Sequence, residues 1–195
     1  MLVSGTGTNL QALIDAARKP GYGAEIVAVG ADRPEIAGLE RAQQAGIPTF
    51  VVAPNDFPNR ADWDAALAAA VGEFDPDLVV LAGFMRLVGA KFLNKFGGRT
   101  INTHPALSPA FPGVNGPKDA LEYGVKVTGA TLFLVDEGVD TGMIIDQATV
   151  RVESEDDVNS LHEKIKQVER IMLVESVGRM VRNGWEIKDR WVKLQ

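Results

Sequence analysis

An amide, an imidazole and a carboxylate are the groups of this chain whose types and spacing suit acyl-transfer chemistry. Asn102 and His104 lie two residues apart in INTHPALSPAFPG, residues 101–113, and Asp140 lies in DEGVDTG, residues 136–142. Alternate residues of a strand point to the same face, so we expect the amide and the imidazole to project together. The chain has only 2 histidines, and histidine is the usual proton carrier near neutral pH. These groups are what the transfer of an acyl group to an amine requires.

A glycine-rich turn near the start of the chain is a candidate anion site. The segment SGTGTN, residues 4–9, joins a short apolar strand to a helix that begins at about Thr8. Glycines let the backbone approach a ligand closely, and a helix start offers unpaired N–H groups. Leu10 stands where a dinucleotide-binding fingerprint has its third glycine, and no Walker A lysine follows. A tight turn capped by Thr8 or Asn9 is the alternative.

For five other polar residues, a place on the protein surface is the first explanation. Lys166 and Glu169 are three residues apart on one helix face, where a solvated ion pair is the ordinary outcome. His162 is expected on the surface of the same helix. Arg60 and Arg86 are single basic residues that can hold a ligand carboxylate, although exposure is the commoner fate of such residues.

The elements that must position these groups alternate between apolar strands and helices as far as His104. Strands are expected at residues 2–4, 25–30, 49–52, 78–83 and 99–104, and helices from about Thr8 and at 36–45, 61–73 and 87–96. This alternation predicts an α/β fold with a mainly parallel sheet flanked by helices. The stiff, proline-rich loop after His104 then lies at the carboxyl edge of the sheet, where ligands bind in such folds.

The pattern changes after residue 124. Partial alternation predicts an antiparallel strand pair, at 125–135 and 143–152, with the acidic loop between the two strands. A long amphipathic helix is expected from Asp156 to about residue 181, and a short strand at about 185–194. We expect all of these elements to belong to one domain spanning residues 1–195.

Composition narrows the classes of protein to consider. The chain has 195 residues, of which 46% are hydrophobic, and a formal net charge of −6, which argues against a nucleic-acid-binding surface. It has no cysteine, so disulfides, cysteine nucleophiles and thiolate metal sites are excluded. No His, Asp and Glu cluster stands at metal-ligand spacing, so we expect no metal. Without a membrane-length apolar run or signal-peptide features, we expect a cytoplasmic protein that does not bind membranes.

In this order and at this length, the segments resemble the phosphoribosylglycinamide formyltransferases, a family of folate-dependent enzymes of purine synthesis. SGTGTNLQALID resembles the family's phosphate loop, LAGFMRLV its folate-cleft segment, INTHPALSPAFPG and DEGVDTG its catalytic segments, and HEKIKQVER its late helix. The match runs from residue 2 to about 194. Two departures stand out: Asn115 and Gly116 lie where many relatives carry a histidine, and only three residues precede Ser4, where the family's first strand is usually longer.

The resemblance implies a Rossmann-like formyltransferase fold and an enzyme of IMP synthesis. Its co-substrate would be 10-formyltetrahydrofolate, and its acceptor the glycyl amine of glycinamide ribonucleotide. A homodimer is left open. In this assignment the catalytic trio is Asn102, His104 and Asp140, the phosphate ligands are Gly7, Thr8 and Asn9, and the other ribonucleotide contacts are Lys166 and Glu169. The folate contacts are Arg60, Met85, Arg86, Leu87, Val88, Val135, Asp136, Glu137, Gly138 and Asp140. The Ser108–Pro109 bond is expected to be cis, as in relatives.

Three alternative functions remain compatible with the same residues. A formyltetrahydrofolate hydrolase has a similar core with water as acceptor, but usually carries an added N-terminal domain for which 195 residues leave no room. Transfer-RNA and sugar formyltransferases share the trio, and the former usually have an extra C-terminal domain. A non-catalytic nucleotide-binding module built on residues 4–9 would leave the trio without a purpose.

Overall fold

Apolar strands and helices alternate through the first half of the chain, as the sequence predicts. The structure, a computed structural model, describes all residues from Met1 to Gln195 and divides them into two compact units, Met1–Asn102 and Thr103–Gln195. Strand β5 (Thr100–His104) runs from the first unit into the second. That the whole chain behaves as one domain stays a prediction.

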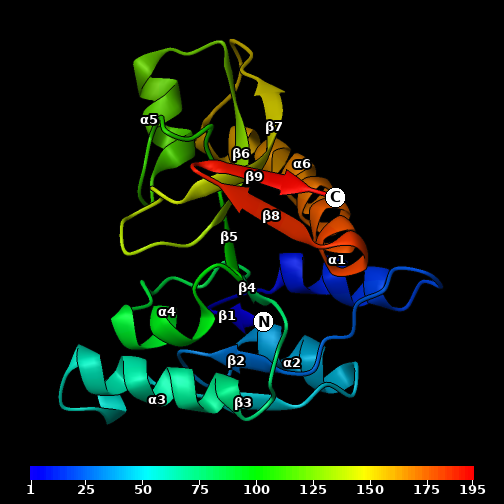
Figure 1. Cartoon of the computed structure of the whole chain (residues 1–195). Helices are drawn as coiled ribbons and strands as arrows, with labels where there is room; N and C mark the ends of the chain where they lie inside the picture. Colours follow the sequence, from blue (N-terminus) through cyan, green and yellow to red (C-terminus); the bar gives the residue numbers. More distant parts are fainter. The chain divides into compact units, whose positions relative to one another are not determined.

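The first unit has a parallel sheet with helices between its strands (Figure 1). Its other elements are β1 (Leu2–Val3), α1 (Thr8–Ala17), β2 (Val29–Ala31), α2 (Ala37–Gln44), β3 (Thr49–Val51), the 3-10 helix η1 (Pro54–Asp56), α3 (Arg60–Gly72), β4 (Val79–Leu81) and α4 (Ala90–Phe96). Every strand pair in this unit is parallel, and the order is β3-β2-β1-β4-β5. The three residues of β2 and of β4 are all buried, as expected for parallel strands covered on both faces.

The strand order reverses at β1, and this places two of the candidate segments next to each other. The chain goes from β1 to β2 on one side, and β4 later pairs with the other side of β1. The carboxyl ends of two strands at such a switch point are where open α/β sheets bind ligands. Here the backbone N–H of Met85, after β4, donates to Ser4 Oγ, after β1, at 2.9 Å. The glycine turn and residues 85–88 therefore share one edge of this sheet.

A buried carboxylate fixes the end of residues 85–88. Asp64 of α3 is only 2% exposed, and its two oxygens accept from the backbone N–H groups of Gly89, at 2.6 Å, and Phe92, at 3.0 Å. These are donors of the first turn of α4, which a helix cannot satisfy by itself. Asp64 thus caps α4 from a neighbouring helix and holds the chain where residues 85–88 end.

The second unit is built on an antiparallel hairpin and one long helix. Its elements are α5 (Gly116–Tyr123), β6 (Val127–Leu134), β7 (Met143–Arg151), α6 (Val158–Asn183), β8 (Trp185–Lys188) and β9 (Trp191–Leu194). Strands β6 and β7 pair antiparallel, with a register shift between Leu132 and Phe133, and α6 packs on both. Seven of the eight residues of β6 are buried, which makes this strand the core of the unit.

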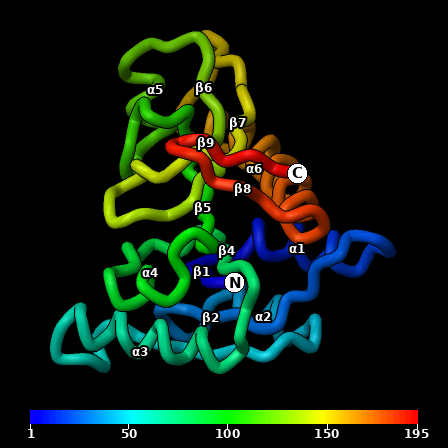
Figure 2. The backbone as a smooth tube through the Cα atoms, in the orientation of Figure 1, coloured from blue at the N-terminus to red at the C-terminus, as the bar shows by residue number.

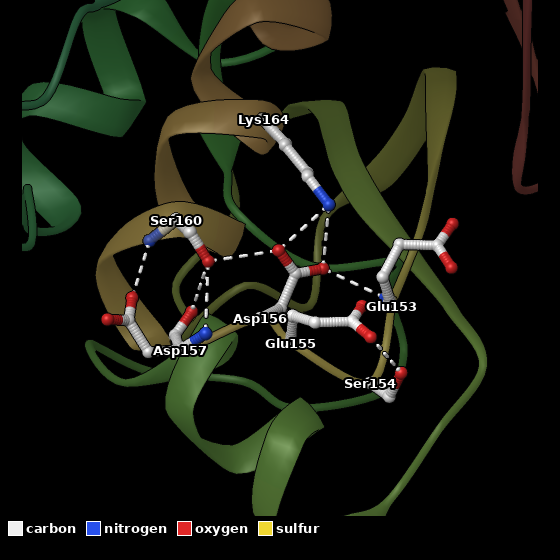
Figure 3. A network of polar contacts seen from close by, with 7 residues as sticks. All are labelled: Glu153, Ser154, Glu155, Asp156, Asp157, Ser160 and Lys164. Carbon is white, nitrogen blue, oxygen red and sulfur yellow. Dashed lines mark hydrogen bonds and ion pairs between the residues drawn. The ribbon is translucent and has the colours of Figure 1, made fainter.

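A polar network fixes the start of α6 (Figure 3). Asp157 is the N-cap: its Oδ1 accepts from the Ser160 N–H at 2.7 Å, while Ser160 Oγ accepts from the Asp157 N–H at 3.0 Å. This reciprocal pair is a capping box. Lys164, one turn further along, forms an ion pair with Asp156 at 2.8 Å. The helix that carries Lys166 and Glu169 therefore begins at a fixed point.

Two parts of the second unit differ from the sequence prediction. The single strand expected at about 185–194 is wrong: β8 and β9 form an antiparallel hairpin, visible in the backbone trace of Figure 2, with Asp189 in the left-handed region at φ 55°. Helix α5 was not predicted, because its Gly-Pro start continues the glycine- and proline-rich loop before it.

In the first unit, the strand expected at 25–30 is shorter and begins later, at Val29–Ala31. None of the helices combines the length and apolar content that crossing a membrane requires.

Candidate active site

His104 ends β5 with both ring nitrogens facing oxygen atoms of the second unit. Its side chain is 3% exposed. Nε2 lies 2.7 Å from the backbone carbonyl oxygen of Phe111, and Nδ1 lies 3.4 Å from Asp140 Oδ2. A carbonyl oxygen only accepts, so Nε2 carries a proton and donates to Phe111. The ring is thereby anchored at Nε2, and Nδ1 is the nitrogen left for chemistry.

Each of the two oxygens that face the ring is a hydrogen-bond acceptor. With Nε2–H directed at the Phe111 carbonyl, Nδ1 can donate to a carboxylate or to a substrate oxygen only when the ring carries its second proton. The 3.4 Å separation from Nδ1 to Oδ2 is longer than an ordinary charge-assisted hydrogen bond, so this contact is loose enough for a substrate oxygen to share.

Asp140 is held by its own loop and by the loop that follows β5. Its Oδ2 accepts from the Gly113 N–H at 2.8 Å, and its backbone has φ 54°, in the left-handed region that aspartate tolerates better than most residues. Its other oxygen, Oδ1, makes no hydrogen bond within the protein. Asp136 closes the same loop, because its Oδ1 accepts from the Gly138 N–H at 3.0 Å and from the Thr141 hydroxyl at 2.7 Å.

The proline-rich loop after His104 is attached to the β6–β7 hairpin. Thr131 Oγ1 donates to the Ala106 carbonyl oxygen at 2.7 Å and accepts from the Ser108 N–H at 2.9 Å. Gln147 of β7 adds a bond to the Ser108 carbonyl oxygen at 3.0 Å. The Ser108–Pro109 bond is cis, which confirms the expectation from the sequence. These bonds place the Phe111 carbonyl and the Gly113 N–H at His104 and Asp140.

Asn102 lies on β5 two residues before His104, in the last position of the first unit. Its side chain is half-buried and makes no hydrogen bond within the protein. The amide N–H groups are therefore free to donate to a ligand. The alternation of a strand puts this amide and the His104 ring on one side of β5.

The glycine turn of the first unit presents backbone N–H groups without a protein cap. Gly7 is the N-cap residue of α1, with φ 69°, and no side chain caps the helix. The expected alternative, a cap by Thr8 or Asn9, is therefore wrong. A Cβ on Gly7 would lie 2.7 Å from the Cα of Gly38, so only glycine fits here.

The carbonyl groups of the same turn are occupied by α2. The Gly5 carbonyl oxygen accepts from the Gly38 N–H at 3.0 Å, and the Thr6 carbonyl oxygen accepts from Arg41 Nε at 2.9 Å. The turn is thus held through its acceptors, which leaves the first N–H groups of α1 as its free polar groups. Asn9 is 9% exposed and its Oδ1 has no partner. An anion is the ligand that such a helix start favours.

Residues 85–88 expose apolar and cationic groups together. Met85 is 60% exposed and Leu87 is 47% exposed, so two large apolar side chains lie at the surface of one short segment, whereas Val88 is buried in the core. Arg60 Nη2 donates to the Leu87 carbonyl oxygen at 2.9 Å, and Arg86 Nε donates to Asp32 Oδ2 at 2.8 Å. The segment suits a ligand with a flat apolar part and a carboxylate.

On α6, Glu169 is buried and Lys166 pairs elsewhere. Glu169 is 7% exposed and accepts no hydrogen bond from the protein, whereas Lys166 forms a close ion pair with Glu163. The solvated Lys166–Glu169 pair considered from the sequence is therefore wrong. His162 is on the exposed side of the helix, as expected. Partial desolvation of its ring, and then the charge of Lys166, lower the pKa of this imidazole below its usual value.

The remaining folate candidates lie in the loop between β6 and β7. Val135 is half-buried, and Glu137 and Gly138 are exposed. Nowhere are three or more His, Cys, Asp or Glu side chains grouped so that they could share a metal ion. The Phe111 carbonyl, the Gly113 N–H and the buried Asp32 were not predicted as parts of the site. Of these, only Asp32, a carboxylate two residues after the strand predicted at 25–30, could have been suspected from the sequence.

Comparisons with known proteins identify the family of this chain. The family model described as formyl transferase matches residues 1–177. A phosphoribosylglycinamide formyltransferase of Mycobacterium tuberculosis is 52% identical over 190 residues, 97% of this chain and 87% of that protein. A trifunctional purine biosynthetic protein of Drosophila melanogaster is 45% identical over 94% of this chain, which spans 14% of its length.

Solved structures agree with the sequence relatives. The crystal structure of a glycinamide ribonucleotide transformylase from Symbiobacterium toebii has a TM-score of 0.96 and 41% identity, and the match covers 99% of this chain and 91% of that one. The predicted fold class, a mainly parallel, Rossmann-like sheet flanked by helices with antiparallel strands added in the C-terminal part, is confirmed by this match.

Proposed function

The chain belongs to the formyl transferase family, and from this we propose that it transfers the formyl group of 10-formyltetrahydrofolate to the glycyl amine of glycinamide ribonucleotide. The similarity to named phosphoribosylglycinamide formyltransferases supports this acceptor, and with it a role in purine biosynthesis. The observation that carries the proposal is the His104 ring, anchored at Nε2 by Phe111 and facing Asp140 through Nδ1.

The first step needs donors for a developing negative charge. The neutral glycyl amine attacks the formyl carbon, and the formyl oxygen becomes an oxyanion in a tetrahedral intermediate. The Nδ1–H of protonated His104 and the free amide of Asn102 donate to this oxygen. Removing one donor of this kind costs about 10²–10³ in rate.

The second step needs a proton to move from one nitrogen to the other. The attacking nitrogen is positively charged in the intermediate and must lose a proton, while the folate nitrogen must gain one as its bond to the formyl carbon breaks. Asp140 Oδ2 is occupied by Gly113 and His104, whereas Oδ1 is free within the protein. We assign Oδ1 as the atom that takes the proton from the amine and returns it to the leaving nitrogen.

Other predicted residues take binding roles in this proposal. The N–H groups at Gly7, Thr8 and Asn9 bind the phosphate of the ribonucleotide, and the buried, unpartnered carboxylate of Glu169 accepts hydrogen bonds from the ribonucleotide. Lys166 adds a positive charge near Glu169. The apolar part of the folate contacts Met85 and Leu87, with Val88 beneath them.

The loop of residues 135–138 contributes to the folate site mainly through its backbone, because the Asp136 carboxylate is committed to Gly138 and Thr141. Arg60 and Arg86 meet the glutamate tail of the folate. We further propose that the enzyme works in the cytoplasm on small molecules alone, without nucleic acid, membrane or metal, and that a homodimer is its candidate assembly.

An assay with each substrate omitted in turn tests the proposed reaction. Purified protein is mixed with 10-formyltetrahydrofolate and glycinamide ribonucleotide, and the folate absorbance is followed while the formylated ribonucleotide is measured by mass spectrometry. We expect turnover only when both substrates are present. Turnover of the folate without the ribonucleotide would instead identify a hydrolase, and no turnover with either acceptor would contradict the proposal.

A further inference from the structure

A buried carboxylate, Asp32, lies directly after β2 and binds two arginines. Its side chain has no exposed surface, whereas those of Arg33 and Arg86 are 50% and 45% exposed. Arg86 Nε donates to Oδ2 at 2.8 Å. Arg33 donates from Nε to Oδ1 at 3.3 Å and from Nη2 to Oδ2 at 3.1 Å. A carboxylate buried this deeply is rare unless it is paired, as it is here.

The backbone next to Arg86 is fixed as well. The Ser4 hydroxyl accepts from the Met85 N–H at 2.9 Å. Burial by itself would raise the pKa of Asp32, but hydrogen bonds from Arg33, Arg86 and the Ser4 hydroxyl hold the pKa of this carboxyl below its usual value. Asp32 therefore holds Arg86 through its carboxylate, and Ser4 separately holds the backbone of the residue before Arg86.

This arrangement uses only one nitrogen of Arg86. The Nη1 and Nη2 groups make no hydrogen bond within the protein, and they form the end of the guanidinium that binds a carboxylate with two parallel bonds. Arg60 of α3, bonded to the Leu87 carbonyl oxygen, is a second exposed guanidinium that contacts this segment. An arginine fixed at Nε and free at its end is preorganised for a carboxylate, and so loses less side-chain freedom on binding.

We propose that Asp32 is a positioning residue, which holds Arg86 so that its terminal nitrogens receive a carboxylate of the folate donor's glutamate tail. This inference rests on the proposed function. It adds a residue, in another strand-to-helix connection and 54 positions away from Arg86, that contacts no substrate and acts through Arg86.

Positioning and simple charge attraction predict opposite effects for one substitution. Replacing Asp32 with asparagine removes a negative charge next to two arginines, so attraction alone would make an anionic donor bind more tightly. If Asp32 positions Arg86, the same change frees the guanidinium and makes the donor bind less tightly. The sign of the change in affinity therefore separates the two accounts.

The experiment compares wild type with Asp32→Asn, using two donors: 10-formyltetrahydrofolate, and the same formylated pterin compound without its glutamate. We expect the KM for the complete donor to rise about tenfold in the variant, with kcat within about threefold of wild type. The KM for the glutamate-free donor and the KM for the ribonucleotide should not change. Arg86→Ala should raise the KM for the complete donor similarly, and Asp32→Asn should add nothing to it in the double variant.

Two controls keep a loss of folding apart from a loss of positioning. Arg33→Gln removes the other partner of Asp32 and should leave the KM for the complete donor within about threefold of wild type, since exposed ion pairs contribute little. A rise in KM for the glutamate-free donor equal to that for the complete donor would mean general damage and would overturn the inference. An unchanged or lower KM for the complete donor would overturn it too. Wild-type protein without transferase activity would contradict the proposed function instead.

Discussion

The glycine turn of the first unit and the corner around His104 in the second unit offer ligands different chemistry. The turn at Gly7 presents backbone N–H groups, and its carbonyls are taken up by α2. The corner presents two side chains, His104 and Asp140, each held by one backbone group, the Phe111 carbonyl and the Gly113 N–H. The first is built to hold a fixed negative charge, and the second to respond to a charge that appears during a reaction.

This difference implies that binding and catalysis can be damaged separately. Contacts made equally in the ground state and the transition state change KM, whereas contacts made only in the transition state change kcat. Substitutions at the turn should therefore act on ribonucleotide affinity, and those at the corner on turnover. The predictions below test this division, beginning with the largest effect.

Replacing His104 with alanine should lower kcat by at least about 10³-fold. The variant loses an oxyanion donor and the partner that Asp140 faces, and one such donor by itself is worth about 10²–10³. Steady-state kinetics give kcat, and calorimetry gives the dissociation constant of the ribonucleotide, which should change little. His162→Gln, at the only other histidine, is the matched control and should keep wild-type turnover.

Replacing Asn9 with aspartate should raise the dissociation constant of the ribonucleotide at least about tenfold. The added carboxylate lies on the first turn of α1, where it repels a bound phosphate, and like charges brought together at a binding site cost several kcal/mol. Asn94→Asp, the same change on an exposed position of α4, should leave the constant unchanged. Equal changes in the dissociation constant in both variants would contradict the placement of the phosphate site at the glycine turn.

Replacing Asp157 with alanine should lower the free energy of unfolding by about 1 kcal/mol, because the capping box of α6 is lost. Denaturant titration measures this change. If residues 1–195 act as one domain, wild type and variant should each show a single transition by both fluorescence and circular dichroism. kcat should stay at the wild-type value, since the cap touches neither the turn nor the corner.

The smallest effect concerns pH and His162. Partial desolvation of the ring, and then the charge of Lys166, lower the folded-state pKa of this histidine below the ordinary 6.5, so the folded chain disfavours the charged form. As pH falls below about 6.5 the unfolded chain binds more protons at this position, and folding stability decreases through that window. The decrease should be smaller in His162→Gln. Unfolding free energies of both proteins between pH 5 and 7.5, in about half-unit steps, check this.

Most helices and strands could be predicted from the sequence, because they depend on the local spacing of apolar residues. The alternation of apolar runs and helices as far as His104, the β6–β7 pair and the long helix α6 were all visible in the sequence, because each follows from the spacing of apolar residues. The start of α5 was hidden, since Gly116 and Pro117 look like the loop before them although proline is common in a helix's first turn. The β8–β9 hairpin was hidden too, because its turn uses Asp189 in place of a glycine.

Contacts between distant residues were beyond such patterns. The sequence suggested that Asn102 and His104 share a strand face, but not that Nε2 of His104 is committed to the Phe111 carbonyl. The spacing of Lys166 and Glu169 suggested an ion pair between them, whereas in the structure Lys166 pairs with Glu163 and Glu169 is buried. The bond between Arg86 and Asp32 joins two connections of the sheet and depends on the strand order.

The most direct test of the division between binding and chemistry is the paired measurement of kcat and ribonucleotide affinity in Asp140→Asn. Asparagine keeps an oxygen for the Gly113 N–H and tolerates φ 54°, so the loop should stay in place while the charge beside His104 is lost. We predict a fall in kcat of at least about 10²-fold with the dissociation constant of the ribonucleotide within about twofold of wild type. Turnover near the wild-type value in this variant would contradict the assignment of the chemistry to His104 and Asp140.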